Sequence, residues 1–387
     1  MQKVDGVIFV HRSIFEGKRK KGGVDFVLDF FIEKGKKFLL IESPLEYSLE
    51  SRTDISYLDS SSVNKITGFK TALNFAPLNW VVEIIVFIYA SLRYGNKGNV
   101  CVAADPLAAL GGVFLKKTNY FSFLYFHLTD YSEKRFPNIF LNFIYQTIFK
   151  IAIRNADLVG CVSSTSLGLV EDLNAKHALF VPNSRDFGAD AQNRVSISER
   201  ERFSLITIPA FVGERYRIYD LVKAIAGLKK KFPRVKLRVV GGLELEVAYV
   251  NKIKNLIDAE DLEENVEFVG FVSKEECTRL SSKSWLGVAL FNEEDSFRKY
   301  SDSLKIREYA SLGVPTITDT NASSSAEDVR KYRVGEVTSS SKGIQEAITM
   351  LFEDEIYYKR ISENALNWAK KFDKRKIVED LFERTFD

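Results

Sequence analysis

The segment at residues 300–315 carries the clearest chemistry in the sequence. Ser303 is placed to cap a helix whose first turn holds Lys305, and Glu308 follows on the same face before the helix ends at Gly313. Backbone N–H groups at a helix N-terminus, together with a lysine, form a phosphate site. A glutamate one turn further along lies within reach of vicinal hydroxyls, such as those of a ribose. An ordinary surface ion pair between Lys305 and Glu308 also explains the spacing.

A second polar pair follows the predicted strand at residues 119–126. His127 and Asp130 stand three residues apart where this strand is predicted to end. Ligands of parallel α/β sheets bind outside the carboxyl ends of the strands, so the pair suits acid–base catalysis or binding of a hydroxyl group. The alternative is structural: His127 bonds a backbone carbonyl, and Asp130 caps the next turn.

A basic loop at residues 12–23 follows the first predicted strand and ends in Gly22 and Gly23. The N–H groups after this glycine pair are suited to receive an anion, although such a pair is also common in simple turns. The run Lys18–Lys21 is either a solvated loop or a contact for a phosphate or an anionic membrane surface. The dinucleotide fingerprint GxGxxG is absent from this loop.

Short apolar runs alternate with segments of helical periodicity along the chain, which favours parallel sheets covered by helices on both faces. The predicted strands lie at residues 4–11, 37–41, 99–104, 119–126, 157–162, 204–208, 235–240, 266–269, 285–291 and 314–318. The main predicted helices lie at 106–117, 136–154, 217–231, 244–258, 273–281, 303–312, 342–353 and 355–384. A hydrophilic stretch at 183–202 is predicted to link two halves.

Composition narrows the class of protein. The chain has 387 residues, enough for two domains, and its net charge of +3 is too small for a protein that coats nucleic acid. Its three cysteines stand far apart, so neither a disulfide framework nor a zinc site is expected. The apolar run at residues 80–92 is short and contains Glu83, so it is not expected to span a bilayer. With charge at Lys3 and Asp5, no signal peptide is expected, and we predict a cytoplasmic protein.

Four segments together resemble glycosyltransferases of the GT-B fold, and are similar to glycosyltransferase family 4. The most specific is SDSLKIREYASLGVPTI at residues 301–317. ADLVGCVSS at 156–164, VPN at 181–183 and VEFVGFVSKEE at 266–276 follow the family's order. The resemblance implies two Rossmann-like domains with parallel sheets facing a central cleft. Residues 1–185 would bind the acceptor, residues 203–370 the nucleotide-sugar, and a helix at 371–387 would cross back to the first domain.

The resemblance also assigns roles to single residues. Those beside the donor are Glu308 at the ribose, Ser303, Leu304 and Lys305 at the diphosphate, Phe271 and Val272 at the base, and Gly213 opposite the diphosphate. His127 or Asp130 would lie near the reacting sugar, and Gly22 and Gly23 on the acceptor side.

Two positions depart from the family's pattern. Tyr300 stands where the family often has a second glutamate, so that contact to the donor sugar is either lost or supplied by Asp302. Arg215 and Arg217 replace a Lys-Gly pair after the Gly213 strand. Arginine grips a diphosphate through two hydrogen bonds, and we expect Arg215 to do so, with Arg217 as the second choice.

The expected reaction is transfer of a hexosyl group from a nucleoside diphosphate sugar to an acceptor hydroxyl, with retention of configuration and without a cofactor or metal. The acceptor is expected to be a carbohydrate or a lipid-linked one, in polysaccharide or glycolipid synthesis. Phe136, Phe140, Phe143 and Phe149 lie along one predicted helix, where they either pack in the core or dock on a membrane. A GT-B-like nucleotide-sugar epimerase and a non-catalytic nucleotide-binding scaffold remain alternatives.

Overall fold

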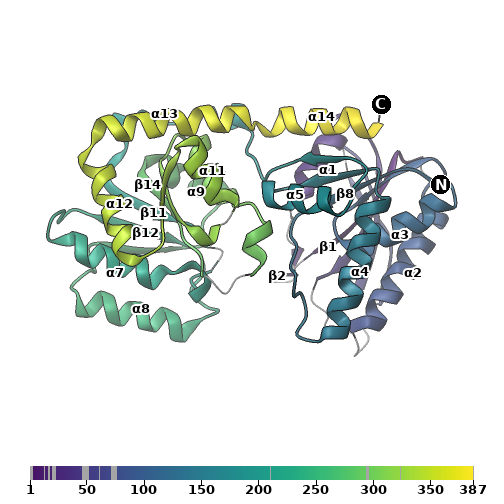
Figure 1. Ribbon diagram of the computed structural model, residues 1–387, viewed down its shortest axis with the longest axis horizontal. Helices are drawn as coiled ribbons and strands as arrows, with labels where there is room; N and C mark the ends of the chain where they lie inside the picture. Colours follow the sequence, from purple (N-terminus) through teal and green to yellow (C-terminus); the bar gives the residue numbers. More distant parts are fainter. Residues whose placement is uncertain are drawn as a thin grey trace. The chain divides into compact units, whose positions relative to one another are not determined.

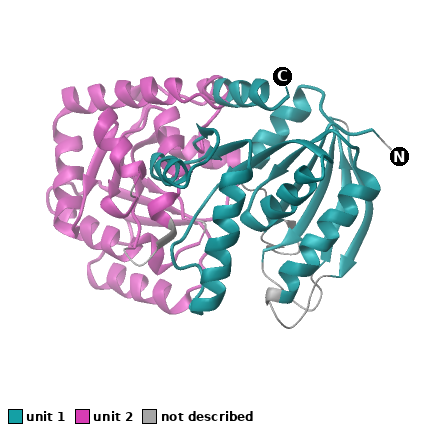
Figure 2. Ribbon diagram, turned by 45° about the vertical axis from the view of Figure 1, so that its right-hand side comes forward, with its two compact units in different colours: residues 1–182, 375–387 teal, residues 183–374 magenta. Residues whose placement is uncertain are grey.

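A computed structural model describes residues 3–12, 14–15, 18–19, 23–45, 52–60, 62–70, 76–209, 211–292, 296–322 and 324–386. The chain divides into two compact units (Figure 2). Unit 1 comprises residues 1–182 and 375–387, and unit 2 comprises residues 183–374.

Unit 1 contains an eight-stranded sheet in the order β10-β9-β8-β7-β1-β4-β5-β6 within the described residues. The strands are β1 (Gly6–Arg12), β4 (Phe38–Pro44), β5 (Arg52–Leu58), β6 (Val63–Lys70), β7 (Asn99–Ala103), β8 (Phe121–Leu128), β9 (Leu158–Cys161) and β10 (Ala178–Phe180), beside a small hairpin of β2 (Ile14–Phe15) and β3 (Lys18–Arg19). The helices are α1 (Asp25–Glu33), α2 (Ala76–Tyr94), α3 (Pro106–Lys117), α4 (Ile139–Asn155), α5 (Ser164–Asp172) and α14 (Lys374–Phe386).

The sheet of unit 1 is parallel except at one edge. Strands β4, β1, β7, β8, β9 and β10 pair in parallel, whereas β5 and β6 form an antiparallel hairpin next to β4. This hairpin was not predicted, because most of its residues are exposed or half-exposed, many are polar, and they carry no long apolar run. Val27, Leu28 and Phe31 of α1 pack into the core with Val378 and Leu381 of α14.

Unit 2 contains a parallel sheet in the order β13-β12-β11-β14-β15-β16. Its strands are β11 (Glu201–Thr207), β12 (Lys236–Val240), β13 (Val266–Gly270), β14 (Ser284–Ala289), β15 (Thr316–Asp319) and β16 (Gly335–Thr338). Its helices are α6 (Phe187–Ala191), α7 (Ile218–Lys229), α8 (Val247–Ala259), α9 (Lys274–Lys283), α10 (Leu304–Ser311), α11 (Ser324–Tyr332), α12 (Ser341–Glu353) and α13 (Glu355–Lys371) (Figure 1).

The strand order of unit 2 reverses between β11 and β14, as it does in doubly wound nucleotide-binding folds. The loops after β11 and β14 therefore lead to the edge of the sheet where a ligand is expected. The stretch 183–202, predicted as a linker, instead belongs to unit 2 and forms the short helix α6. The single helix predicted at 355–384 is broken into α13 and α14 around Phe372 and Asp373.

Candidate functional site

The N-terminus of α10 presents backbone donors and a lysine together. Ser303 occupies the N-cap position, but its side chain does not make the capping bond that its sequence position predicts. Its backbone N–H instead donates to Ser325 Oγ at 2.9 Å. The first-turn N–H groups therefore receive no cap from Ser303 and are suited to bind an anion. Leu304, at the start of the helix, is exposed.

Lys305 lies in this first turn among other cationic groups. Its Nζ is 4.7 Å from the centre of the Tyr216 ring. Burial, and then the positive charges of Arg298 and Arg215, lower the pKa of Lys305 to about 8. An ammonium that its surroundings destabilise in this way gains by pairing with an anion. The arrangement therefore favours a ligand that carries phosphate.

Glu308 stands one turn further along α10. Within the described part of the chain its carboxylate makes no hydrogen bond and no ion pair, and the side chain is half-buried. Burial raises its pKa, and Asp190 adds to this shift, whereas Arg185, Lys274 and Lys305 oppose it. A half-buried carboxylate without donors is suited to accept hydrogen bonds from ligand hydroxyls.

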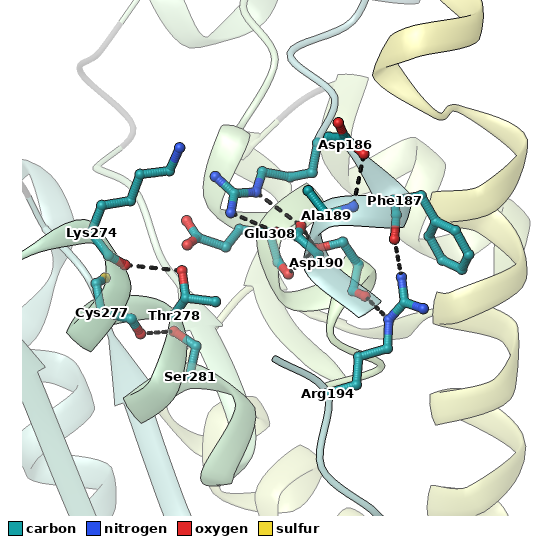
Figure 3. A network of polar contacts seen from close by, with 12 residues as sticks. Asp186, Phe187, Ala189, Asp190, Arg194, Lys274, Cys277, Thr278, Ser281 and Glu308 are labelled. Carbon is teal, nitrogen blue, oxygen red and sulfur yellow. Dashed lines mark hydrogen bonds and ion pairs between the residues drawn. The ribbon is translucent and has the colours of Figure 1, made fainter. Parts of the chain in front are cut away.

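A polar network fixes the C-terminal half of α10 beside α6 (Figure 3). Arg185 donates to both oxygens of Asp190, at 3.0 and 2.8 Å, and the Ser311 hydroxyl donates to the same carboxylate at 2.6 Å. Arg194 donates to the backbone oxygens of Ser311 and Phe187, each at 2.7 Å. In Figure 3, Glu308 lies between this network and Lys274 and Cys277 of α9. Arg185 and Asp190 were missed because their segment was interpreted as a linker.

Asp302 holds the segment that enters α10. It is buried and accepts from Arg307 Nε at 2.6 Å, from the Asn183 backbone N–H at 2.8 Å and from Ser325 Oγ at 3.2 Å. Both carboxylate oxygens are thus engaged inside unit 2. The contact to a donor sugar expected of Asp302 stays a prediction, and its present bonds give it a positioning role.

The loop after β11 brings Gly213 and two arginines to the same sheet edge. A Cβ at Gly213 would lie 2.5 Å from Glu246 Oε1, so a larger residue requires a shift there. Arg215 is exposed, and its carbonyl accepts from the Asn292 N–H at 2.9 Å. Arg217 is held by ion pairs to Asp220 and to the fully buried Asp319, at 2.8 and 3.1 Å. By exposure, Arg215 is therefore more accessible to a ligand than Arg217.

Phe271 and Val272 directly follow β13, which is two strands away from β11 in the sheet of unit 2. The Phe271 ring is 54% exposed and lies against Gly242, where a Cβ would come within 2.5 Å of the ring. Val272 is half-buried against the core of unit 2. An exposed ring at a strand end is suited to stack on a planar base.

Unit 1 has its own cavity, of about 280 Å³, at the carboxyl ends of its strands. Asp130 and Arg135 line it, with an ion-pair distance of 3.6 Å, and so do His11 and Asp105. The remaining walls are mostly apolar and aromatic, with Trp80, Phe136 and Tyr145 among them. The cavity combines flat aromatic surfaces with a few charged groups, as carbohydrate and amphiphile sites do.

His11 is the polar centre of this cavity and was not predicted. Its Nδ1 is 2.6 Å from Asp105 Oδ2, and its Nε2 is 3.1 Å from Glu83 Oε2. Burial alone lowers its pKa, but Asp105 and Glu83 outweigh this effect and raise the pKa to about 10. His11 is therefore protonated at neutral pH and acts as a fixed cation rather than a base. The position of His11 at the end of the first predicted strand, where ligands bind, could have marked it as a candidate.

His127 lies elsewhere, inside β8. It is fully buried, its Nδ1 is 2.7 Å from Tyr125 Oη, and burial lowers its pKa to about 4. The structure thus separates His127 from Asp130 and gives His127 a structural place, although its partner is the Tyr125 hydroxyl and not a backbone carbonyl. Gly23 directly precedes Val24, the N-cap of α1, whereas Gly22 lies outside the described residues.

We expect His127→Ala to lower the Tm of the protein. The change leaves Tyr125 without its buried partner and opens a small void, which costs about 1–3 kcal/mol or more. Scanning calorimetry with and without nucleotide measures the effect. An unchanged Tm combined with a loss of sugar transfer would instead indicate that His127 takes part in the reaction.

Among the described residues, no group of three His, Cys, Asp or Glu side chains is placed to hold a metal ion. None of the described helices is long and apolar enough to cross a membrane.

Solved structures with the same two-domain architecture are numerous. The structure of Alr3699/HepE from Anabaena in complex with UDP aligns with a TM-score of 0.70 at 18% identity, covering 98% of this chain and 99% of that one. Sucrose-phosphate synthase from Thermosynechococcus elongatus aligns with a TM-score of 0.68 at 15% identity, covering 98% of each chain. The α,α-trehalose 6-phosphate synthase from Burkholderia multivorans aligns at 0.69 and 11%, covering 100% of this chain and 98% of that one. No curated protein sequence matches.

The fold is therefore that of the GT-B glycosyltransferases, as the sequence resemblance predicts. Residues 191–368 match the family model described as Glycosyl transferases group 1. This region, which contains α10 and the loops after β11 and β13, is a domain of that family.

Proposed function

We propose that this chain transfers a hexosyl group from a nucleoside diphosphate sugar to an acceptor hydroxyl bound in unit 1. The observation that carries the proposal lies on α10, where a helix N-terminus without a side-chain cap and Lys305 stand one turn from Glu308, whose carboxylate makes no hydrogen bond or ion pair within the described residues. The helix N-terminus and Lys305 fit a diphosphate, and Glu308 fits the hydroxyls of a ribose next to that diphosphate.

During transfer, the bond from the anomeric carbon to the diphosphate oxygen breaks. A bond to the acceptor oxygen forms, and the acceptor hydroxyl loses its proton. Negative charge grows on the departing diphosphate, and preorganised cations and N–H groups stabilise it. We assign this task to Lys305, Arg215 and the first turn of α10. Retention of configuration and membership of glycosyltransferase family 4 remain predictions from the sequence resemblance.

The nucleotide is proposed to be uridine diphosphate, because related structures of HepE contain UDP and UDP-glucose. Thermal-shift measurements with UDP, GDP and ADP test this choice. Stabilisation by UDP alone is the expected result. Stabilisation by GDP or ADP instead would mean that the donor carries a different base, and the proposed donor site would stand. No stabilisation by any of the three nucleotides would contradict the donor site itself.

Transfer is expected to persist in excess EDTA. The proposal meets the charge of the diphosphate with Lys305, Arg215 and backbone N–H groups, and so requires no divalent cation. Product formation is measured with and without chelator, and with added Mg²⁺ or Mn²⁺. Complete loss that either ion restores would contradict a metal-independent reaction.

The acceptor is proposed to occupy the cavity of unit 1, with a sugar or lipid-linked sugar against Trp80 and Tyr145. Asp130→Asn is then expected to lower transfer roughly tenfold or more, since a charge-assisted hydrogen bond is worth about 1.5–3 kcal/mol. Donor affinity stays unchanged in calorimetry. Asp380→Asn is the control, because Asp380 is also a half-exposed aspartate of unit 1 paired with an arginine. Equal rates in both variants would remove Asp130 from the acceptor site.

A further inference from the structure

Helices α2, α3 and α4 of unit 1 carry large apolar side chains on their outward sides. The three helices lie side by side, with α3 in the middle (Figure 1). On α2, the exposed residues recur every three or four positions, at Leu78, Val81, Ile85, Tyr89 and Leu92. This spacing places them on one stripe of the helix.

The outward stripe of α4 is equally apolar. Phe140 and Phe143 are 76% and 71% exposed, Ile139 and Ile151 are exposed near the two ends of the helix, and Phe114 of α3 is exposed between the two stripes. Core packing, the simpler expectation for the phenylalanines of this helix, is wrong for Phe140 and Phe143 and right for Phe149. We call the exposed apolar residues of α2, α3 and α4 the apolar face.

The charges of these helices are nearly all positive. The sequences of α2, α3 and α4 contain one acidic residue, Glu83, which is fully buried and bonded to His11. Arg93, Lys117, Lys150 and Arg154 are exposed toward the C-terminal ends of the helices. These ends lie on one side of unit 1, because α2, α3 and α4 each precede a strand of the same parallel run, β7, β8 and β9. The apolar face thus has a basic rim.

We propose that unit 1 docks on an anionic lipid bilayer through the apolar face and its basic rim. Helices that lie in a membrane interface combine a lipid-facing apolar stripe with Lys and Arg that attract anionic headgroups. An exposed apolar patch spread over three helices is unusual for a surface that only meets water. A second copy of the chain fits less well, because the rim cations would find no exposed acidic partner on α2, α3 or α4.

The same face lies beside the cavity of unit 1. Trp80 of α2 and Tyr145 and Ile148 of α4 line that cavity. Docking therefore brings the bilayer surface next to the place where the acceptor is proposed to bind. This last step, which makes the acceptor a membrane-borne amphiphile, rests on the proposed function, whereas the docking itself does not.

Flotation of the full chain with lipid vesicles tests the proposal. We expect binding to vesicles of phosphatidylcholine and phosphatidylglycerol, and much weaker binding to phosphatidylcholine alone. Phe140→Ser combined with Phe143→Ser is expected to lower the partition coefficient about tenfold or more. The control is Leu245→Ser combined with Val247→Ser, which removes two side chains of unit 2 that are 60% and 57% exposed.

A second pair of variants tests the rim. Lys150→Gln combined with Arg154→Gln is expected to weaken binding to anionic vesicles about 25-fold, at roughly fivefold per charge. Binding to neutral vesicles should be unchanged, and salt should weaken only the anionic component. Melting curves check that each variant is folded.

Three results would overturn the proposal. One is absence of flotation by a folded wild-type chain, and another is an equal loss in the Leu245 and Val247 control. The third is a stable wild-type dimer in sedimentation that becomes monomeric in the Phe140 and Phe143 variant. That result would show that the apolar face binds a second copy of the chain. Donor affinity measured by calorimetry is independent of lipid, so failure of the docking and failure of the glycosyltransferase proposal are distinguishable.

Discussion

Lys305→Ala is expected to lower kcat by on the order of a hundredfold, with little change in Tm. In the proposed donor site the ammonium faces the position where charge grows on the leaving diphosphate, and removal of one such group typically costs about 2.7–4 kcal/mol in the transition state. Folding loses little, because burial and nearby cations already lower the pKa of Lys305 to about 8. Steady-state kinetics and calorimetric unfolding measure the two effects separately.

The pH profile gives an independent check of the same residue. Lys305 is charged below its pKa, so kcat/KM of the wild type should fall as pH rises through about 8. Lys305→Arg keeps its charge in this range and should lose that fall. Lys342→Ala, at an exposed lysine of α12, is the matched control. A normal kcat in the Lys305→Ala variant would indicate that Arg215 or the backbone amides of α10 stabilise the diphosphate instead.

Glu308→Ala is expected to weaken donor binding roughly tenfold or more. The ribose hydroxyls lose a charged acceptor, and such a hydrogen bond is worth about 1.5–3 kcal/mol. Since burial raises the pKa of Glu308, wild-type affinity should also weaken as pH falls toward that raised value, where the carboxylate becomes neutral. Calorimetric titration with the nucleoside diphosphate measures both effects.

Binding of the 2′-deoxy nucleotide tests whether the effect of Glu308→Ala on affinity arises at the ribose. The wild type should bind it more weakly than the ribonucleotide, whereas Glu308→Ala should bind the two about equally. Glu346→Ala is the matched control, because Glu346 is an exposed glutamate that also follows a lysine, Lys342, on a helix. Unchanged discrimination in the Glu308 variant would contradict the ribose assignment.

The sequence predicted the arrangement of the candidate donor residues better than that of the residues around the cavity of unit 1. Lys305 and Glu308 share one short helix, so local spacing alone brings them together. His11 comes from a strand, Glu83 from a helix and Asp105 from the N-cap of another helix, far apart in the chain, and only the tertiary fold joins them. No local pattern marks such a group.

His127 illustrates how a small error in strand length changes a prediction. The strand was expected to end at residue 126, which would have left His127 in a loop at the sheet edge. Strand β8 continues to Leu128, and His127 therefore points to one face of the sheet and is buried. Asp130 lies beyond this end and does reach the cavity.

The segment at 183–202 was misjudged because its composition is polar. Its polar groups pair with one another and with backbone, as Arg185 does with Asp190 and Arg194 with Ser311. Paired polar groups can be ordered without an apolar period, which explains why hydrophobic patterning failed there.

The division of the chain into units has a consequence for its synthesis. Residues 1–182 emerge from the ribosome first, yet the core they form also includes Val378 and Leu381 of α14, which emerge after all of unit 2. Unit 1 therefore stays incomplete, with Phe30 and Phe31 lacking their contacts to Phe382, until the end of translation. Unit 2 is continuous in sequence and is able to close its core earlier, so the part of the chain made first is the part finished last.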